Sequence, residues 1–287
     1  MILSIASGKG GTGKTTISTA LAVAANTNVS YYDCDVEEPN GLIFLKPKFT
    51  VTNDFFTEVP RIESEQCIGC GACEKFCQFN ALMRIADTTV VMDEMCHDCG
   101  GCYFVCPNEA ITSAPFQIGR INKGKHLTKT GNVIKVVSGT LEIGRTMSPP
   151  LIKEVKKGIK DSRVNIIDCP PGASCPMITA VDGSDFVILV TEPTPFGLND
   201  LKIAVDTLRK LGLPFGVIIN KANIGNSDVA DYCNYEQIEI LTQIDSMPEI
   251  AQQYSEGKNI LNEIPEIQAQ LKMALQKIFF RHCGQAV

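Results

Sequence analysis

A glycine-rich loop near the start of the chain carries the first residues suited to chemistry, Ser7-Gly8-Lys9-Gly10-Gly11-Thr12-Gly13-Lys14-Thr15-Thr16. Its stretch from Gly8 to Thr15 matches G-x-x-x-x-G-K-[ST] in full. Such a loop binds phosphate when a strand precedes it and a helix follows it, because backbone N–H groups and the helix N-terminus then face the anion. The apolar runs 2–6 and 17–25 are typical of that strand and that helix. We therefore predict a phosphate site here, rather than a glycine-rich turn with a chance lysine.

The residues of this loop have separate predicted tasks. We expect Lys14 to reach the β- and γ-phosphates of a nucleotide, and the Thr15 hydroxyl to bind Mg²⁺. The predicted nucleotide-binding residues of the loop are Gly8, Gly10, Gly11, Thr12, Gly13, Lys14, Thr15 and Thr16.

Two cysteine-rich runs form a second candidate site. They are Cys67-Ile-Gly-Cys70-Gly-Ala-Cys73-Glu-Lys-Phe-Cys77 and Cys96-His-Asp-Cys99-Gly-Gly-Cys102-Tyr-Phe-Val-Cys106, and both have the spacing C-x2-C-x2-C-x3-C. Thirteen cysteines are many for a chain that uses them only as small apolar residues, and disulfides are rare in a reducing compartment. The repeated spacing indicates an internal duplication that binds metal.

Four thiolates at this spacing are typical of iron–sulfur ligation, in which the fourth cysteine of each run binds the other cluster. We therefore assign four cysteines to each of two [4Fe–4S] clusters. Cluster 1 takes Cys67, Cys70, Cys73 and Cys106, and cluster 2 takes Cys77, Cys96, Cys99 and Cys102. Zinc is the rival, since it also takes four cysteines in C-x2-C pairs. Two triplets, each with a single fourth cysteine, favour the clusters.

Alternating strands and helices must position both sites. Strands are expected at 2–6, 29–33, 133–137, 164–168, 186–191, 215–220 and 238–241, and helices at 17–25, 149–160, 198–211 and 265–281. This alternation predicts an α/β fold, a mainly parallel sheet with helices on both faces. The cysteine runs interrupt it, so we expect a small inserted α+β ferredoxin-like domain at 59–113. Residues 1–58 and 114–287 are expected to form a P-loop ATPase domain.

Composition and charge limit the classes of partner. The chain has 287 residues, of which 44% are hydrophobic, and a net charge of -6, which argues against a general nucleic-acid surface. It begins with a core strand instead of a signal peptide, and no apolar run could span a bilayer, so we expect a cytoplasmic protein. An apolar stripe, Leu271, Leu275, Ile278 and Phe279, suits either packing on the sheet or a membrane surface. Packing is favoured, so we expect no membrane partner.

Lys9 is not needed for the chain's own phosphates, because Lys14 serves them. With this extra lysine, the loop resembles the deviant phosphate loop of the MinD/ParA/Mrp ATPases, a group that includes the nitrogenase iron protein. The resemblance implies a nucleotide-dependent dimer, either a homodimer or a heterodimer with a paralogue, in which Lys9 reaches the partner's nucleotide. It implies the catalytic residues Lys9, Lys14 and Asp35.

The resemblance continues downstream. Asp33-Cys34-Asp35 resembles the first switch, which implies that Asp35 positions the attacking water. Asp168-Cys169-Pro170-Pro171-Gly172 resembles the Walker B aspartate and second switch, which implies that Asp168 holds Mg²⁺ and Gly172 senses the γ-phosphate. The implied magnesium residues are Thr15, Asp35 and Asp168. The implied base-contacting residues are Asn220, Pro248 and Glu249.

Together these features are similar to a MinD-type ATPase with an inserted two-cluster ferredoxin domain. The resemblance implies Mg²⁺-dependent ATP hydrolysis that repositions the clusters, with the loop after Asp35 leading into the insert. The output would be electron delivery to a redox partner or assembly of a metal centre on a partner protein. A positioning or complex-assembly ATPase that docks through the ferredoxin domain, and an iron–sulfur cluster carrier, are the alternatives. Cys175 stands where the nitrogenase iron protein has a cluster-bridging cysteine, and a third cluster stays open.

Overall fold

The computed structural model describes residues 1–287 except 26, 87, 160–163, 263 and 284–287. In this part of the chain the body is a nine-stranded sheet with the order β11-β10-β9-β1-β8-β2-β7-β6-β3. Its strands are β1 (Ile2–Ala6), β2 (Val29–Asp33), β3 (Lys48–Ile62), β6 (Ile111–Leu127), β7 (Val133–Leu141), β8 (Val164–Asp168), β9 (Phe186–Thr191), β10 (Phe215–Asn220) and β11 (Ile240–Ile244). The pairs from β11 to β7 are parallel, whereas β6 and β3 add antiparallel pairs at one edge. The predicted α/β fold with a mainly parallel sheet is confirmed.

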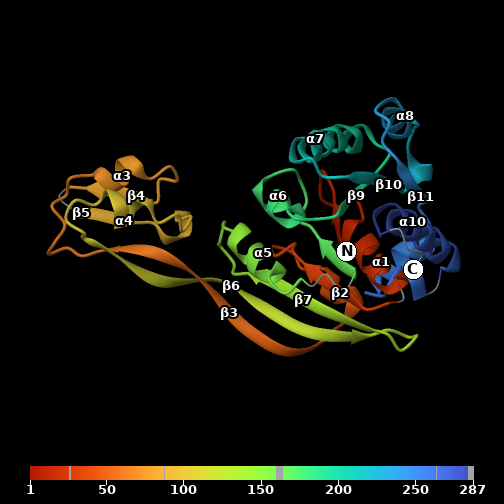
Figure 1. Cartoon of the computed structure of the whole chain (residues 1–287), viewed down its shortest axis with the longest axis horizontal. Helices are drawn as coiled ribbons and strands as arrows, with labels where there is room; N and C mark the ends of the chain where they lie inside the picture. The colour runs from red at the N-terminus through yellow and green to blue at the C-terminus, as the bar shows by residue number, and fades with distance from the viewer. Residues whose placement is uncertain (26, 87, 160–163, 263, 284–287) are drawn as a thin grey trace.

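Helices cover both faces of this sheet (Figure 1). They are α1 (Lys14–Ala24), α2 (Gly41–Leu45), α5 (Pro149–Lys156), α6 (Cys175–Val181), α7 (Pro195–Leu211), α8 (Asp228–Tyr235), α9 (Pro248–Ser255) and α10 (Pro265–Cys283), with 3-10 turns η2 (Ala222–Ile224) and η3 (Ile260–Asn262). Successive strand residues point to opposite faces, so Ile166 joins a core with α1 and α10, and Ile167 joins a core with α5 to α8. Both faces of the central strands are therefore buried.

Most of the predicted elements of the body are confirmed. The ranges expected for β1, β2, β8, β9 and β10 agree with the structure, while β7 continues to Leu141 and β11 lies at Ile240–Ile244 instead of 238–241. The predicted helix 149–160 ends at Lys156, and residue 160 lies outside the described residues.

The apolar stripe of α10 packs inside the protein. Leu271, Leu275, Ile278 and Phe279 are all buried in the core beside α1. Packing on the sheet, and not a free membrane-binding face, accounts for the stripe. No helix within the described ranges is both long and apolar enough to cross a membrane.

The long ribbon of β3 and β6 was not predicted. The two strands pair antiparallel from Lys48 to Ile62, whereas β6 pairs with β7 from Gly119 to Leu127. The remainder of the ribbon projects from the body and carries the cysteine lobe, residues 63–110, at its far end (Figure 1). The expected domain boundaries at 58/59 and 113/114 fall within β3 and β6.

The described residues of the cysteine lobe form short helices and strands. They are α3 (Ala72–Phe76), β4 (Leu82–Ile85), β5 (Thr88–Val91), η1 (Asp93–Met95) and α4 (Gly101–Val105). The loop after Asp35 does not lead directly into this lobe, because α2 and the whole of β3 intervene.

Candidate functional site

The glycine-rich loop joins β1 to α1 and packs closely against β10 and α7. Gly13 has φ +89°, a left-handed conformation that glycine adopts freely. A Cβ at Gly13 would lie 2.4 Å from Nδ2 of Asn220, and this nitrogen donates to the Thr12 carbonyl oxygen over 2.8 Å. A Cβ at Gly8 would lie 2.3 Å from the carbonyl oxygen of Asp200 in α7. Glycine is required at both positions, because Asn220 and Asp200 approach the loop too closely to leave room for a Cβ.

Lys14 is the centre of charge beneath the loop. Its Nζ donates to Oδ1 of Asp168 over 3.0 Å and to Oδ2 of Asp35 over 3.4 Å. Burial on its own lowers the pKa of Lys14, but Asp168, Asp35 and Asp33 outweigh it and raise this pKa, so the ammonium stays charged. Burial raises the pKa of Asp35 to about 6, against the opposing effect of Lys14.

The aspartates meet because their strands are neighbours. Asp33 and Asp168 are register partners at the carboxyl ends of β2 and β8, the edge where α/β sheets bind ligands. Asp33 accepts a 3.1 Å hydrogen bond from the N–H of Gly41, the first residue of α2. Burial raises the pKa of Asp33 well above its usual range. Asp33 thus anchors α2, while Asp35 and Asp168 face Lys14.

Tyr31 is a member of the site that sequence reasoning missed. Its hydroxyl donates to Oδ2 of Asp168 over 3.0 Å and lies 3.1 Å from Oγ of Ser18. The side chain is fully buried, and burial raises its pKa, so the phenol keeps its proton. It therefore fixes the second oxygen of Asp168. The available signal was its position two residues before Asp33 in a strand, which places both side chains on one face.

A cavity of ≈ 540 Å³ opens above this network, within the usual size of small-molecule pockets. The predicted site residues that line it are Lys9, Gly10, Gly11, Thr12, Gly13, Lys14, Thr15, Thr16, Asp35 and Asn220. Residues after β11 complete the wall, among them Met247 and Ile250.

Five predicted residues lie outside this lining. Gly8 packs on α7, and Asp168 lies beneath Lys14. Gly172 donates its N–H to the Ser7 carbonyl oxygen over 2.9 Å. Pro248 and Glu249 begin α9, between the lining residues Met247 and Ile250.

Lys9 lies at the rim of the cavity, partly exposed. Its Nζ is 3.7 Å from Oε2 of Glu192, which also forms an ion pair with Lys221. Cys175 is exposed at the first residue of α6, apart from both cysteine runs.

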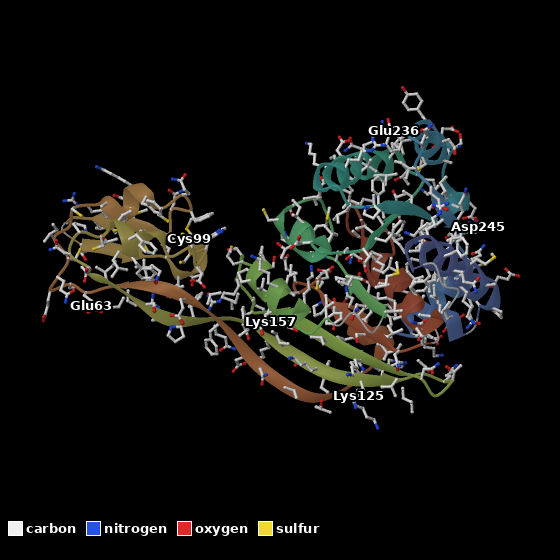
Figure 2. The ribbon with its side chains drawn as sticks, in the orientation of Figure 1. Glu63, Cys99, Lys125, Lys157, Glu236 and Asp245 are labelled. Carbon is white, nitrogen blue, oxygen red and sulfur yellow. The ribbon has the colours of Figure 1, made fainter. Side chains whose placement is uncertain are left out.

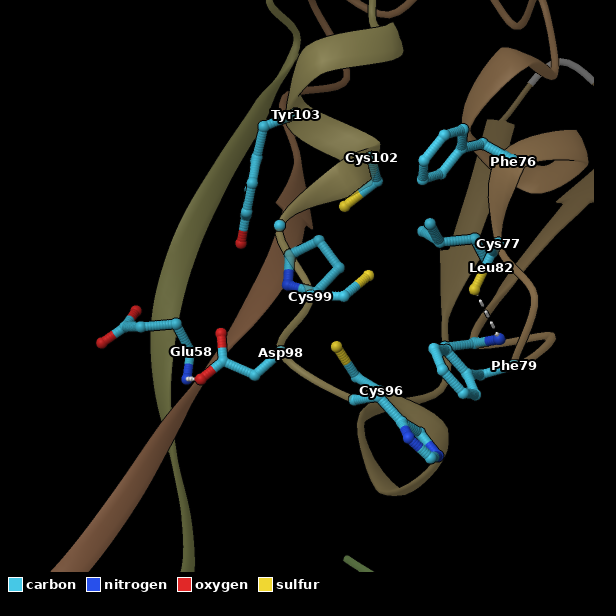
Figure 3. Close-up of a pocket in the computed structure, with 14 residues that line it drawn as sticks. Glu58, Phe76, Cys77, Phe79, Leu82, Cys96, Asp98, Cys99, Cys102 and Tyr103 are labelled. Atoms are coloured by element: carbon cyan, nitrogen blue, oxygen red, sulfur yellow. Dashed lines mark hydrogen bonds between the residues drawn. The ribbon is translucent and has the colours of Figure 1, made fainter. Parts of the chain in front are cut away.

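The cysteine lobe brings its eight run cysteines together in two sets of four. Each set takes three cysteines from one run and the fourth from the other run, and each lines a separate cavity. The first set is Cys67, Cys70, Cys73 and Cys106, and the second set is Cys77, Cys96, Cys99 and Cys102. Figure 3 shows Cys96, Cys99 and Cys102 of the second set directed into a space shared with Cys77.

Backbone groups approach the sulfurs in the same way in both sets. The N–H of Ala81 donates to Sγ of Cys77 over 3.3 Å, and the N–H of Ala110 donates to Sγ of Cys106 over 3.2 Å. Gly71 and Gly100, before α3 and α4, both have φ +72°. Four thiols around a cavity, with N–H donors to sulfur, fit the requirements of an iron–sulfur cluster.

The surroundings of the two sets differ. The cavity of the second set is also lined by Glu58, Asp98 and Tyr103 (Figure 3). The ring of His97 stacks on Phe79 at 3.5 Å beside it. The cavity of the first set is lined instead by residues such as Thr89 and Asn108. Carboxylates therefore lie near the second set.

The chain is similar to a nucleotide-binding family and to several known proteins. Residues 3–261 match the CobQ/CobB/MinD/ParA nucleotide binding domain. An uncharacterized protein of Methanocaldococcus jannaschii, MJ0579, is 32% identical over 232 residues, which cover 79% of this chain and 82% of that protein. The iron-sulfur cluster carrier protein of Aquifex aeolicus is 24% identical over 92% of this chain and 63% of its own length. Ferredoxin-3 of Chlorobaculum tepidum is 37% identical over 57 residues, 18% of this chain and 92% of the ferredoxin.

Solved structures resemble the fold. The cell division ATPase MinD of Pyrococcus furiosus aligns with a TM-score of 0.57 and 21% identity over 96% of each chain. The architecture of the body is thus shared with MinD.

Proposed function

This chain belongs to the CobQ/CobB/MinD/ParA nucleotide-binding family, and from that premise we propose that it is a Mg²⁺-dependent ATPase whose nucleotide state repositions two [4Fe–4S] clusters. The clusters would deliver electrons to a redox partner or serve assembly of a metal centre on it. One observation carries the proposal: a single chain holds a glycine-loop cavity with a buried lysine–carboxylate network and two sets of four thiols.

Each group of the nucleotide site has a proposed role. Lys14 would bind the β- and γ-phosphates, and Thr15, Asp35 and Asp168 would hold Mg²⁺, which would neutralise phosphate charge. Asp35 is a carboxylate at neutral pH, because its pKa is about 6, and it orients the attacking water. Tyr31 holds Asp168 in place. Asn220, Pro248 and Glu249 contact the base, and Gly172 responds to the γ-phosphate.

The cysteine lobe supplies the redox half of the proposal. Cluster 1 is held by the first set of cysteines and cluster 2 by the second set, within an inserted domain at 59–113 between the ATPase segments 1–58 and 114–287. Bound clusters provide one-electron transfer. The arrangement favours clusters over zinc, because each cavity takes three cysteines from one run and the fourth from the other run, whereas zinc takes C-x2-C pairs.

The dimer is the third part of the proposal. Lys9 lies at the rim of the cavity, where a second subunit could meet it. In a homodimer, or a heterodimer with a paralogue, Lys9 completes the partner's site. Lys9→Ala and Lys14→Ala subunits should each be inactive, but their mixture should recover activity, since one site then has both lysines. A mixture as inactive as its components overturns the trans role.

Anaerobic purification followed by iron, sulfide and EPR measurements tests the cluster proposal. We expect about eight iron and about eight sulfide per chain, and an EPR spectrum that differs between ADP and a non-hydrolysable ATP analogue. Zinc without iron would overturn the redox role, and a spectrum indifferent to the nucleotide would overturn the coupling.

The similarity to an iron-sulfur cluster carrier protein favours one second candidate, transfer of a cluster to an acceptor. A carrier loses iron to an apo-acceptor during incubation, whereas an electron-transfer protein keeps both clusters. Iron analysis of the two separated proteins distinguishes these functions.

A further inference from the structure

The cysteine lobe touches the body at a second place besides the ribbon. The contact is formed by loop 142–146, which follows β7 and precedes α5. Nη1 of Arg145 lies 3.3 Å from Oε1 of Glu94, and Oγ1 of Thr146 donates to the Glu94 carbonyl oxygen over 3.1 Å. Glu94 belongs to η1, which ends directly before the cluster ligand Cys96. Loop 142–146 thus binds the segment that leads into the second cysteine set.

Arg145 is held in position from behind by the ribbon. Its guanidinium carbon lies 4.0 Å from the ring centroid of Phe116, and its Nε donates to the Gln117 carbonyl oxygen over 3.2 Å. Stacking and a backbone acceptor fix a planar guanidinium more firmly than an isolated surface ion pair does. The side chain is therefore preorganised to meet Glu94.

η1 also contacts the end of the ribbon that carries the lobe. Arg61 donates two hydrogen bonds to Asp93, at 2.6 Å and 2.8 Å. Bidentate pairs of this kind are the stronger form of such contacts. Since η1 is fixed to the ribbon tip by Arg61, the contacts of Arg145 and Thr146 with Glu94 must change if the lobe moves relative to the body.

The same loop is connected to the nucleotide site. Leu141, at the end of β7, donates its N–H to the carbonyl oxygen of Val36 over 2.8 Å, and Val36 directly follows Asp35. Glu142 then donates its N–H to the Ile118 carbonyl oxygen over 2.9 Å. The backbone after Asp35 is thereby joined to the start of loop 142–146.

The loop has few apolar contacts to resist movement. Ile143 is fully exposed, at 101%, so polar bonds, and not a buried side chain, hold the loop in place. Segments of this kind open at low energetic cost and are suited to switching. Figure 2 shows Cys99 of the second set on the side of the lobe nearer the body, and Glu63 on the far side.

From these contacts we propose that loop 142–146 couples the nucleotide site to the second cysteine set, with Arg145 as its positioning residue. The route runs from Asp35 through Val36, Leu141 and Arg145 to Glu94, and β6 of the ribbon supports it at Arg145. This inference rests on the proposed coupling of nucleotide state to the clusters, and it names the element responsible.

Hydrogen–deuterium exchange of the anaerobic holoprotein tests this assignment. Exchange is compared with Mg²⁺-ADP and with a Mg²⁺-bound non-hydrolysable ATP analogue, in peptides covering 34–41 and 92–99. In the unaltered protein both peptides should change. In Arg145→Ala, the change at 92–99 should fall by about fivefold, the low end of coupling between two sites, while the change at 34–41 persists and shows that nucleotide still binds.

Two further variants make the outcome specific. Arg209→Ala removes a comparable partly exposed pair, Arg209–Glu236, far along α7, and should behave as the unaltered protein. Glu94→Ala removes the other partner of the pair and should lower the response at 92–99 as much as Arg145→Ala does. A full response in Arg145→Ala overturns the loop's role alone. An unaltered protein whose 92–99 peptide ignores the nucleotide overturns the proposed function and this inference together.

Discussion

The body and the cysteine lobe are stabilised in different ways. The body has two large apolar cores, one on each face of its sheet, built from strand and helix side chains. Among the described residues of the lobe, the apolar cluster has three buried members, Cys73, Leu82 and Cys102, and two of these three are predicted cluster ligands. Burial of apolar area supports the first region, whereas so small a core leaves metal ligation to support the second. We therefore expect that a change which disrupts one region leaves the other region folded.

Loss of the clusters should have the largest effect. In the double variant C70A/C99A, which removes an exposed ligand from each set, the lobe should unfold and be cleaved by protease at least about tenfold faster. The ATP dissociation constant of the body should stay within about twofold. Limited proteolysis and nucleotide titration measure both quantities, and Cys175→Ser, an exposed cysteine of the body, is the control. A protease-resistant lobe without iron would contradict the comparison.

The converse change should disable the body alone. Lys14→Ala removes the predicted phosphate ligand and leaves Asp35 and Asp168 without their shared cation, so ATP hydrolysis should fall by about 100-fold or more. Iron content and the visible spectrum of the lobe should not change. Phosphate release and iron analysis check the two halves, and retention of a tenth of the activity would refute the assignment.

Paired cysteine variants sharpen the comparison within the lobe. Cys67 and Cys106 line one cavity, so C67A/C106A should lose one cluster and keep about four iron per chain. Cys77 lines the other cavity, so C67A/C77A should lose both clusters. Iron analysis distinguishes the sets, because equal iron in the two variants is incompatible with the crossed assignment.

The smallest expected effect is on how the stability of the body depends on pH. The pKa of Asp35, about 6 in the folded protein against an ordinary value of 3.8, means that the folded state binds this proton more tightly than the unfolded state. The charged carboxylate therefore costs stability above pH 6, by up to about 3 kcal/mol, and this cost disappears as the pH falls from 6 towards 4. Without Mg²⁺ or nucleotide, Asp35→Asn should melt a few degrees higher at pH 7.5, and its advantage should shrink towards pH 5. Melting curves over this range check the sign.

The sequence predicted the parts of the molecule whose pattern is local. Buried strands such as Val164–Asp168 are apolar runs closed by an acidic residue, and the cysteine spacing is visible without a fold. β3 was missed because its first half is exposed and its pairing with β6 is irregular after Phe49 and Phe55, so no two-residue alternation marks it. Tyr31 was missed because its role depends on Asp168, on a strand far along the chain.

The irregularity between Phe55 and Phe56 lies where the ribbon parts from the sheet, since the pairing of β6 with β7 begins at Gly119, the partner of Phe55. A bulge bends and twists a strand locally, so a hinge at this point would turn the ribbon relative to the sheet. The arm beyond it, residues 56–62, is about 20 Å long at about 3.3 Å per residue. A rotation of about 10° at this point would move the base of the lobe by roughly 3–4 Å. One-electron transfer becomes slower as the separation grows, so under the proposed function a displacement of this size would change the rate of transfer to a partner.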